Sequence, residues 1–202
     1  MPANYDLLSP GSYYHLYNRA IGSELMFRND DNYRFFLQKI INHISPIASF
    51  YAYSLVPNHF HFLISIHEYE VIALQYGETK SKEFPKDIVP VSEFLMERFS
   101  NCFNAYTKSF NSAHNRKGKL FMDHLHRRQV QGDAYFTKVI HYIHANAVHH
   151  GLVSEMQFWP YSSYPAFLSN APTIIERQHV LDWFDGKERF IQFHQQPVEL
   201  KL

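Results

Sequence analysis

The segment from residue 48 to residue 67 constrains the fold of this chain more than any other. Residues 48–56, ASFYAYSLV, and residues 59–67, HFHFLISIH, are rich in aromatic and aliphatic side chains, and Pro57-Asn58 separates them. Two apolar runs of this length around a two-residue turn predict an antiparallel β-hairpin. We therefore expect the chain to build a sheet around this hairpin.

The second run of this hairpin begins with two histidines that flank one phenylalanine, His59-Phe60-His61. Because side chains alternate between the two faces of a strand, His59 and His61 share one face, while Phe60 and Phe62 point into a core on the other. Two imidazoles side by side on a strand form a pair of candidate metal ligands. Polar residues on a half-buried strand give the same pattern, and spacing alone favours that second interpretation.

The remaining patterns predict an α+β fold. We expect strands over residues 12–21 and 120–130, and helices over residues 31–45, from Ser92 for about 18 residues, and over residues 133–148. Residues 68–90 are polar and contain Pro85 and Pro90, so they are predicted to form a loop. This order is a split βαβ pattern, ferredoxin-like, with a mostly antiparallel sheet and helices packed on one face.

We expect one domain over residues 10–153 and a C-terminal extension over residues 154–202 that packs on the same domain. A short helix is predicted around residues 176–185 in that extension. The helix over 133–148 has an apolar stripe and, beside it, a polar stripe that consists of Tyr135, Lys138, Tyr142 and Asn146. Tyr142 and Asn146 are one turn apart and therefore neighbours on the helix surface. Taken alone, they are typical of the rim of an amphipathic helix.

Composition limits the classes of protein to be considered. Lys+Arg and Asp+Glu both number 19, and this balance counts against strong non-specific binding to duplex DNA. The single cysteine excludes an intramolecular disulfide and a zinc site made of several thiolates. No secretion signal and no long apolar run stand in the sequence, so we expect a soluble, cytoplasmic protein without a membrane span.

Three blocks taken in order resemble a known family. They are Pro57-Asn58-His59-Phe60-His61, the helix end YIHANAVHHGLV over residues 142–153, and WPYSSY over residues 159–164. They resemble the REP-associated tyrosine transposases, which belong to the insertion-sequence-200-like single-strand transposases of the HUH endonuclease superfamily. The resemblance covers about residues 10–168. One departure is Ala147, which stands where the family usually has proline.

The resemblance implies a DNA strand-transfer enzyme with a divided active site. His59, His61 and Asn146 would bind one divalent metal ion, Mg²⁺ or Mn²⁺. Tyr142 would be the nucleophile that attacks a phosphate and forms a 5′-phosphotyrosine intermediate. The substrate would be single-stranded DNA marked by a hairpin. The best basic candidates for DNA contacts are Arg116, Lys117, Lys119, Arg127 and Arg128, and Lys138 could supply a positive charge near Tyr142.

Two other functions stay open. A domesticated descendant of this family would bind DNA hairpins, with or without cutting them. A metal hydrolase of another class would use His59 and His61, but it needs an acidic ligand close to the pair, and the sequence offers only His67 and Glu68 nearby. Related transposases act as monomers or as homodimers that exchange the tyrosine helix, and the sequence favours neither state.

Overall fold

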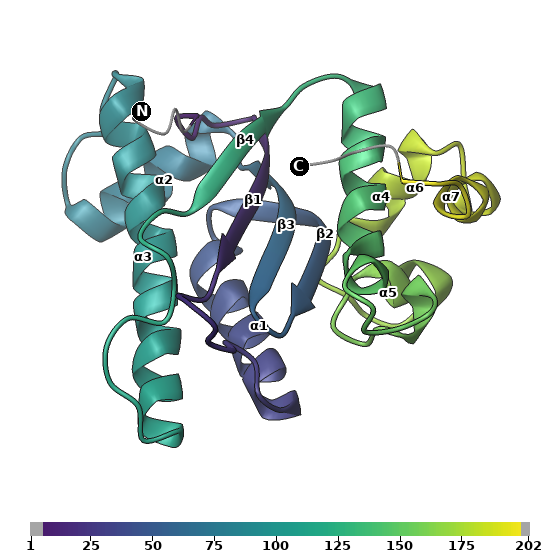
Figure 1. Cartoon of the computed structure of the whole chain (residues 1–202). Helices are drawn as coiled ribbons and strands as arrows, with labels where there is room; N and C mark the ends of the chain where they lie inside the picture. The colour runs from purple at the N-terminus through teal and green to yellow at the C-terminus, as the bar shows by residue number, and fades with distance from the viewer. Residues whose placement is uncertain (1–5, 199–202) are drawn as a thin grey trace.

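The computed structural model describes residues 6–198, and its centre is a four-stranded antiparallel sheet (Figure 1). The strands are β1 (Tyr13–Arg19), β2 (Ala48–Val56), β3 (His59–Ile66) and β4 (His126–Val130), in the order β2-β3-β1-β4. Each pair of neighbours is antiparallel. The predicted α+β, ferredoxin-like fold is therefore confirmed, and so is the hairpin around Pro57-Asn58.

One face of the sheet is covered by α1 (Asp30–Ile44) and α3 (Ile88–Ala113). Phe36 of α1 is at the centre of this layer, where its ring centroid lies 5.3 Å from that of Phe60 on β3 and 4.9 Å from that of Tyr106 on α3. The rings of Phe62, Phe103 and Phe121 surround the same position. The alternation in β3 thus places Phe60 and Phe62 in an aromatic core, as the sequence predicts.

The opposite face of the sheet is covered by α4 (Asp133–His149), and the C-terminal helices lie beside α4 (Figure 1). These are η1 (Met156–Phe158), α5 (Tyr164–Leu168), α6 (Arg177–Trp183) and α7 (Lys187–His194). The prediction that helices pack on one face only is therefore wrong. The split βαβ order accounts only for the helices that connect strands, whereas α4 follows the last strand and closes the second face.

The prediction of a loop over residues 68–90 is wrong. They contain α2 (Tyr69–Lys80) and the first turn of α3, which begins at Ile88 rather than Ser92. In α2 only Ile72 is fully buried and Leu74 is 67% exposed, so the segment lacks the apolar stripe that predicts a helix. Pro90 lies in the first turn of α3, where the missing N–H costs no hydrogen bond.

The last strand is shorter than the predicted segment 120–130. Phe121 forms an isolated bridge with Ala20, and the chain then bends before β4 begins at His126. His124 is therefore exposed outside the strand, and only His126 of the His124-Leu125-His126 sequence lies on the sheet.

The C-terminal segment also protects the free edge of β2. The Leu55 N–H donates to Tyr161 O at 2.9 Å, the Ser163 N–H donates to Tyr53 O at 2.9 Å, and the Glu176 N–H donates to Phe50 O at 2.8 Å. An edge strand paired in this way cannot recruit another chain. The predicted helix near 176–185 corresponds to α6, and the domain division at residue 154 stays a prediction. Within residues 6–198 no helix is both long and apolar enough to cross a membrane.

Candidate active site

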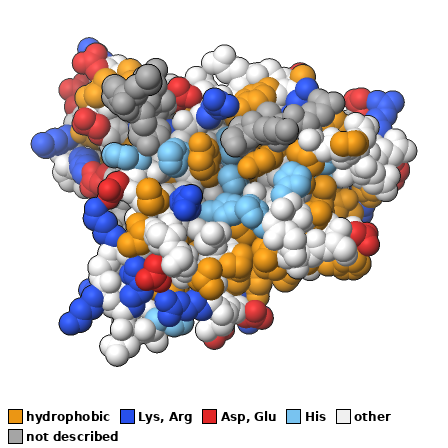
Figure 2. All heavy atoms as spheres, viewed as in Figure 1, with side chains coloured by type: hydrophobic (Ala, Val, Ile, Leu, Met, Phe, Trp, Pro, Cys, Tyr) orange, Lys and Arg blue, Asp and Glu red, His pale blue; other side chains and the backbone are white. Residues whose placement is uncertain are grey.

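His59 and His61 lie at the start of β3, in the middle of the sheet. His61 faces Tyr17 of β1 and Ser54 of β2 in the register, and His59 faces Arg19 of β1. Directly paired residues of antiparallel strands share a face, so these side chains all belong to the face covered by α4. Figure 2 shows histidine side chains gathered at the centre of this side of the molecule.

Packing at both ends fixes α4 over the histidine pair. Near its start, the Phe136 ring lies 3.8 Å from the Trp183 ring of α6 and 5.4 Å from the Tyr13 ring of β1, centroid to centroid. Further along, His144 is completely buried and bonded to residues of the C-terminal segment. The predicted core stripe of this helix, which consists of Phe136, Val139, Ile140, Ile143 and Ala147, is buried throughout.

The fold brings the tyrosine of α4 to the histidines of β3. The Tyr142 ring centroid lies 5.5 Å from that of His61, with the two planes at 88°. The ring centroids of His59 and His61 are 5.2 Å apart, also nearly perpendicular at 89°. His59 and His61 belong to β3 and Tyr142 belongs to α4, so the fold joins two segments that are far apart in the sequence.

Asn146 completes this group and is the least satisfied member of it. Its side chain is 2% exposed, and its Oδ1 has no hydrogen-bond partner among the described residues. The amide lies close enough to His59 and Tyr142 to affect the pKa of both. An unpaired amide oxygen in a buried position costs about 1–3 kcal/mol, so a group that needs this oxygen as a ligand is a physical reason for its presence.

Burial keeps both imidazoles neutral. It lowers the pKa of His59 to about 4, an effect to which His150 adds and which the Asn146 amide partly opposes. Burial also lowers the pKa of His61 well below its usual value, with further contributions from His15 and His59. A neutral imidazole has a lone pair on one nitrogen, which is the form that binds metal ions.

His59 and His61 each form a hydrogen bond through Nδ1. His59 Nδ1 lies 2.8 Å from Asn58 Oδ1, which can only accept, so Nδ1 carries the proton and the lone pair is on Nε2. His61 Nδ1 lies 2.9 Å from Nε2 of His15, a buried histidine on β1. Such outer partners orient ligand histidines in metal sites.

The donors present fit a divalent ion. Within residues 6–198 no group of three or more His, Cys, Asp or Glu side chains is arranged to hold a metal. The available set is therefore two imidazoles and one amide oxygen, from His59, His61 and Asn146. A set of this kind has mixed nitrogen and oxygen character, which suits Mn²⁺, and it leaves the remaining positions of Mg²⁺ to oxygen ligands from water or phosphate.

The environment of Tyr142 does not activate its hydroxyl. Burial raises the pKa of Tyr142 above its usual value, the nearby Tyr17 adds to the increase, and the Asn146 amide opposes it. The phenol is therefore protonated at neutral pH and needs a cation to become a nucleophile.

Comparison with solved structures finds the same arrangement of elements in another protein. A structure described as a REP-associated tyrosine transposase bound to a REP hairpin superposes with a TM-score of 0.58. The match covers 87% of this chain and 94% of that one, at 15% sequence identity. The chain shares its fold with a REP-associated tyrosine transposase. No protein-family profile and no curated protein sequence matches.

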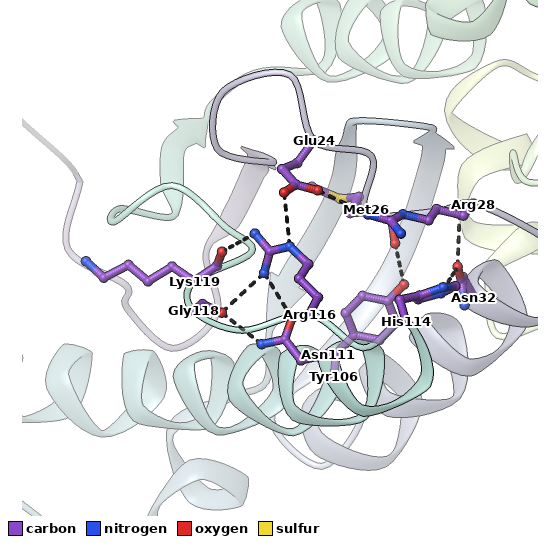
Figure 3. Close-up of polar contacts among 10 residues, drawn as sticks. All are labelled: Glu24, Met26, Arg28, Asn32, Tyr106, Asn111, His114, Arg116, Gly118 and Lys119. Carbon is purple, nitrogen blue, oxygen red and sulfur yellow. Dashed lines mark hydrogen bonds and ion pairs between the residues drawn. The ribbon is translucent and has the colours of Figure 1, made fainter.

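The basic residues predicted to contact DNA lie in different surroundings. Arg116 is held in place by its own chain: Nε contacts Glu24 Oε1 at 3.1 Å, Nη1 donates to Asn111 Oδ1 at 2.9 Å, and Nη2 donates to the carbonyl of Lys119 at 2.6 Å (Figure 3). Lys117 is exposed, and the Lys119 ammonium pairs with Asp123. Arg116 thus fixes the loop that presents Lys117 and Lys119.

The two arginines of β4 point to opposite faces of the sheet. Arg127 pairs in register with the core residue Leu16, and its Nε donates to Asp6 O at 2.6 Å. Arg128 pairs with His15, and therefore shares the face of the histidines. Lys138 of α4 lines a small cavity of about 160 Å³ with His141 and Phe193, on the side of the C-terminal helix α7.

Three residues next to the histidine pair were missed by the sequence analysis. His15 contacts His61, the charge of Arg19 lowers the pKa of His59, and the His150 ring centroid lies 4.7 Å from that of His59. Strand alternation within residues 12–21 places His15 and Arg19 on one face. The missing information was the pairing of that strand with β3, which no local pattern specifies.

Proposed function

We propose that this protein is a metal-dependent HUH-type tyrosine transposase that cuts and rejoins single-stranded DNA. The observation that carries this proposal is the position of Tyr142 against His61, with the unpaired amide oxygen of Asn146 beside them. The shared fold with a REP-associated tyrosine transposase supports it.

His59, His61 and Asn146 would hold one Mg²⁺ or Mn²⁺ ion. None of the three side chains carries a charge, so the ion when bound would keep its full positive charge as a Lewis acid for the phosphoryl oxygens and the leaving oxygen. The orientation of His59 by Asn58, at 2.8 Å, is the strongest support for this role in the chain itself.

Tyr142 would act as the nucleophile. Its Oη forms a bond to the phosphorus while the bond from phosphorus to the 3′-oxygen breaks. The phenolic proton is lost, and the 3′-oxygen takes up a proton to become a hydroxyl. The products are a 5′-phosphotyrosine and a free 3′-OH. Because one phosphodiester replaces another, attack by a different 3′-OH rejoins the strand without an external energy source.

The DNA would be single-stranded at the cut and marked by a hairpin, since the protein that shares this fold was solved with a REP hairpin. Arg128 and Arg19 are the cations on the histidine face, so we assign them to the phosphates next to the cut. Lys117 and Lys119, on the loop that Arg116 fixes, would contact phosphates further away. Tyr142 lies beside His61 of the same chain, so one chain can supply every proposed site residue.

A metal hydrolase that uses His59 and His61 is less well supported. Such an enzyme needs an acidic ligand, and among residues 6–198 no metal-holding group of His, Cys, Asp and Glu is formed. The two nearby candidates in the sequence, His67 and Glu68, follow the last residue of β3, at the end of the strand opposite to His59.

The decisive experiment is a search for the covalent intermediate. The full-length protein is incubated in Mn²⁺ with hairpin DNA that has single-stranded flanks and a 3′ label, because the 5′-phosphotyrosine retains the fragment with the 3′ end; it is then denatured and separated by gel electrophoresis. We expect an adduct for wild type and for the control Tyr69→Phe, an exposed tyrosine on α2, and none for Tyr142→Phe. Hairpin binding without any adduct in wild type would indicate a non-cutting DNA-binding protein. An adduct that persists in Tyr142→Phe would exclude the proposed nucleophile.

A further inference from the structure

A contact between two buried histidines ties β1 to the proposed metal ligand on β3. His15 Nε2 and His61 Nδ1 are 2.9 Å apart, and the two ring planes are within 16° of parallel, with their centroids 5.1 Å apart. His15 is 0% exposed and His61 is 5% exposed. His15 belongs to none of the motifs that define the site, so its role has to come from this contact.

The distance shows what connects the two rings. A separation of 2.9 Å is that of a hydrogen bond. Two nitrogens that bind one tetrahedral ion at 2.0–2.1 Å would be about 3.3 Å apart, so an ion does not lie between these rings. Between two neutral imidazoles a hydrogen bond needs one protonated and one unprotonated nitrogen, so one proton lies between His15 and His61.

The pair therefore has two arrangements with opposite consequences for metal binding. In the first, His61 carries its proton on Nδ1, donates to His15 Nε2, and has its lone pair on Nε2. In the second, His15 Nε2 donates, His61 Nδ1 accepts, and the His61 proton is on Nε2. Only the first arrangement leaves His61 a nitrogen that can bind an ion.

We propose that His15 is a positioning residue that holds His61 in the tautomer protonated on Nδ1, so that His61 Nε2 is the metal ligand. This inference rests on the proposed metal site. His59 receives the equivalent orientation from the Asn58 amide oxygen, which can only accept. His15 differs from Asn58 Oδ1 because it can also donate. Whether His61 Nε2 can bind a metal ion therefore depends on which tautomers the two histidines adopt.

The free energies of the two arrangements differ because of the other nitrogen of His15. His15 Nδ1 is buried and has no hydrogen-bond partner among the described residues. It would be an unpaired N–H in the metal-ready arrangement and an unpaired lone pair in the other. A buried unpaired N–H is rarer, and costs more free energy, than a buried unpaired lone pair. Without an ion, the second arrangement therefore competes with the first. Binding of the ion shifts the pair to the first arrangement.

The first test measures Mn²⁺ binding by the full-length protein with electron paramagnetic resonance of the free ion. In His15→Leu we expect the dissociation constant to rise about 10- to 100-fold, because the acceptor for His61 Nδ1–H is lost. His15→Gln should bind close to wild type, since its amide oxygen can accept the same bond. His67→Leu, another histidine on this side of the hairpin with one side-chain bond to Ser49, is the matched control and should not change binding. Thermal unfolding of each variant reports whether it folds.

The second test needs no variant. Long-range ¹H–¹⁵N spectra of the ¹⁵N-histidine-labelled protein loaded with Zn²⁺ should show the His61 proton on Nδ1 and the His15 proton on Nδ1. A loaded protein with His61 protonated on Nε2, or a folded His15→Leu that binds Mn²⁺ like wild type, would overturn the role of His15 and leave the transposase proposal intact. A wild type that binds neither Mn²⁺ nor Zn²⁺ would instead overturn the metal site itself.

Discussion

The Tyr142 ring of α4 lies 5.5 Å from the His61 ring of β3 and nearly perpendicular to it. Neither residue is placed by its local sequence alone. Phe136 and His144, one on either side of Tyr142 along α4, pack against the sheet and the C-terminal helices. The position of the proposed nucleophile therefore depends on the C-terminal segment as well as on the sheet.

Two equally buried asparagines should respond differently to truncation. Asn146 and Asn18 are each 2% exposed. Both polar atoms of the Asn18 amide are bonded, since Oδ1 accepts from the Arg19 N–H at 2.8 Å and Nδ2 donates to Met122 O at 3.2 Å, whereas Asn146 Oδ1 has no partner among the described residues. We expect Asn18→Ala to lower the free energy of unfolding by about 1–3 kcal/mol, and Asn146→Ala to change it by less.

The same comparison in metal binding should give the opposite order. Asn146→Ala should weaken Mn²⁺ binding about tenfold or more, because an oxygen ligand is lost, and Asn18→Ala should leave it near wild type. Urea unfolding and calorimetric titration with Mn²⁺ measure the two quantities. If Asn146→Ala loses as much stability as Asn18→Ala and keeps its metal affinity, Asn146 is a structural residue and not a ligand.

Neighbouring arginines on β4 offer a matched pair for DNA binding. Arg128 lies on the histidine face and Arg127 on the other, where it is bonded to Asp6 O. We expect Arg128→Gln to weaken binding of single-stranded DNA and to reduce the slope of log K against log salt by about 0.7–1, as for the loss of one phosphate contact. Arg127→Gln should leave that slope unchanged.

The measurement is a series of fluorescence-anisotropy titrations with a labelled hairpin at several salt concentrations. Arg19→Gln, on the same face next to His59, should behave like Arg128→Gln. Equal slopes for the Arg127 and Arg128 variants would mean that the DNA does not follow the histidine face.

The sequence specified the hairpin, the helix of Tyr142 and the fold because each depends on local signals. Alternation in β3 separates His59 and His61 from Phe60 and Phe62, and a helical stripe from Phe136 to Ala147 faces the sheet. Both patterns act over a few residues, so one sequence is enough to find them. The motifs of the family resemblance then paired β3 with α4, which spacing alone could not do.

What was missed depends on tertiary pairing. Helix α2 has one fully buried residue, so no periodic signal marks it. His15 and Arg19 become neighbours of the histidine pair only because β1, and not another strand, lies beside β3. Arg116 stays a predicted DNA contact, and the sequence does not show that Glu24, Asn111 and two backbone carbonyls surround its guanidinium (Figure 3). The sequence shows that a residue is charged, but it does not show which groups pair with that charge in the folded protein.

A second group of histidines, away from the candidate active site, makes stability depend on pH. His194 Nδ1–H donates to Phe190 O at 2.8 Å, so His194 Nε2 accepts from His144 Nδ1–H at 2.8 Å. His144 Nε2 then accepts from the Ser163 hydroxyl, also at 2.8 Å. This one-way chain connects α7, α4 and the segment on the edge of β2, and it requires both imidazoles to be neutral.

Acid should therefore destabilise the fold through this chain. Burial lowers the pKa of His194 to about 3 and that of His144 well below its usual value, with His141 adding to both effects. Because the unfolded chain takes up protons near pH 6.5, these groups stabilise the fold above about pH 6.5. Their contribution is lost as the pH falls from there toward 3, by up to about 1.4 kcal/mol per pH unit for each histidine.

The test is urea unfolding at pH 8, 7, 6 and 5 for wild type and His194→Gln. Glutamine can still form a hydrogen bond to His144 but does not titrate, so the free energy of unfolding of the variant should fall less steeply below pH 6.5. His15 and His61, which are also buried and neutral, contribute equally to both proteins and cancel in the comparison. Parallel pH profiles would show that the connection between α4 and α7 does not depend on the protonation of His194.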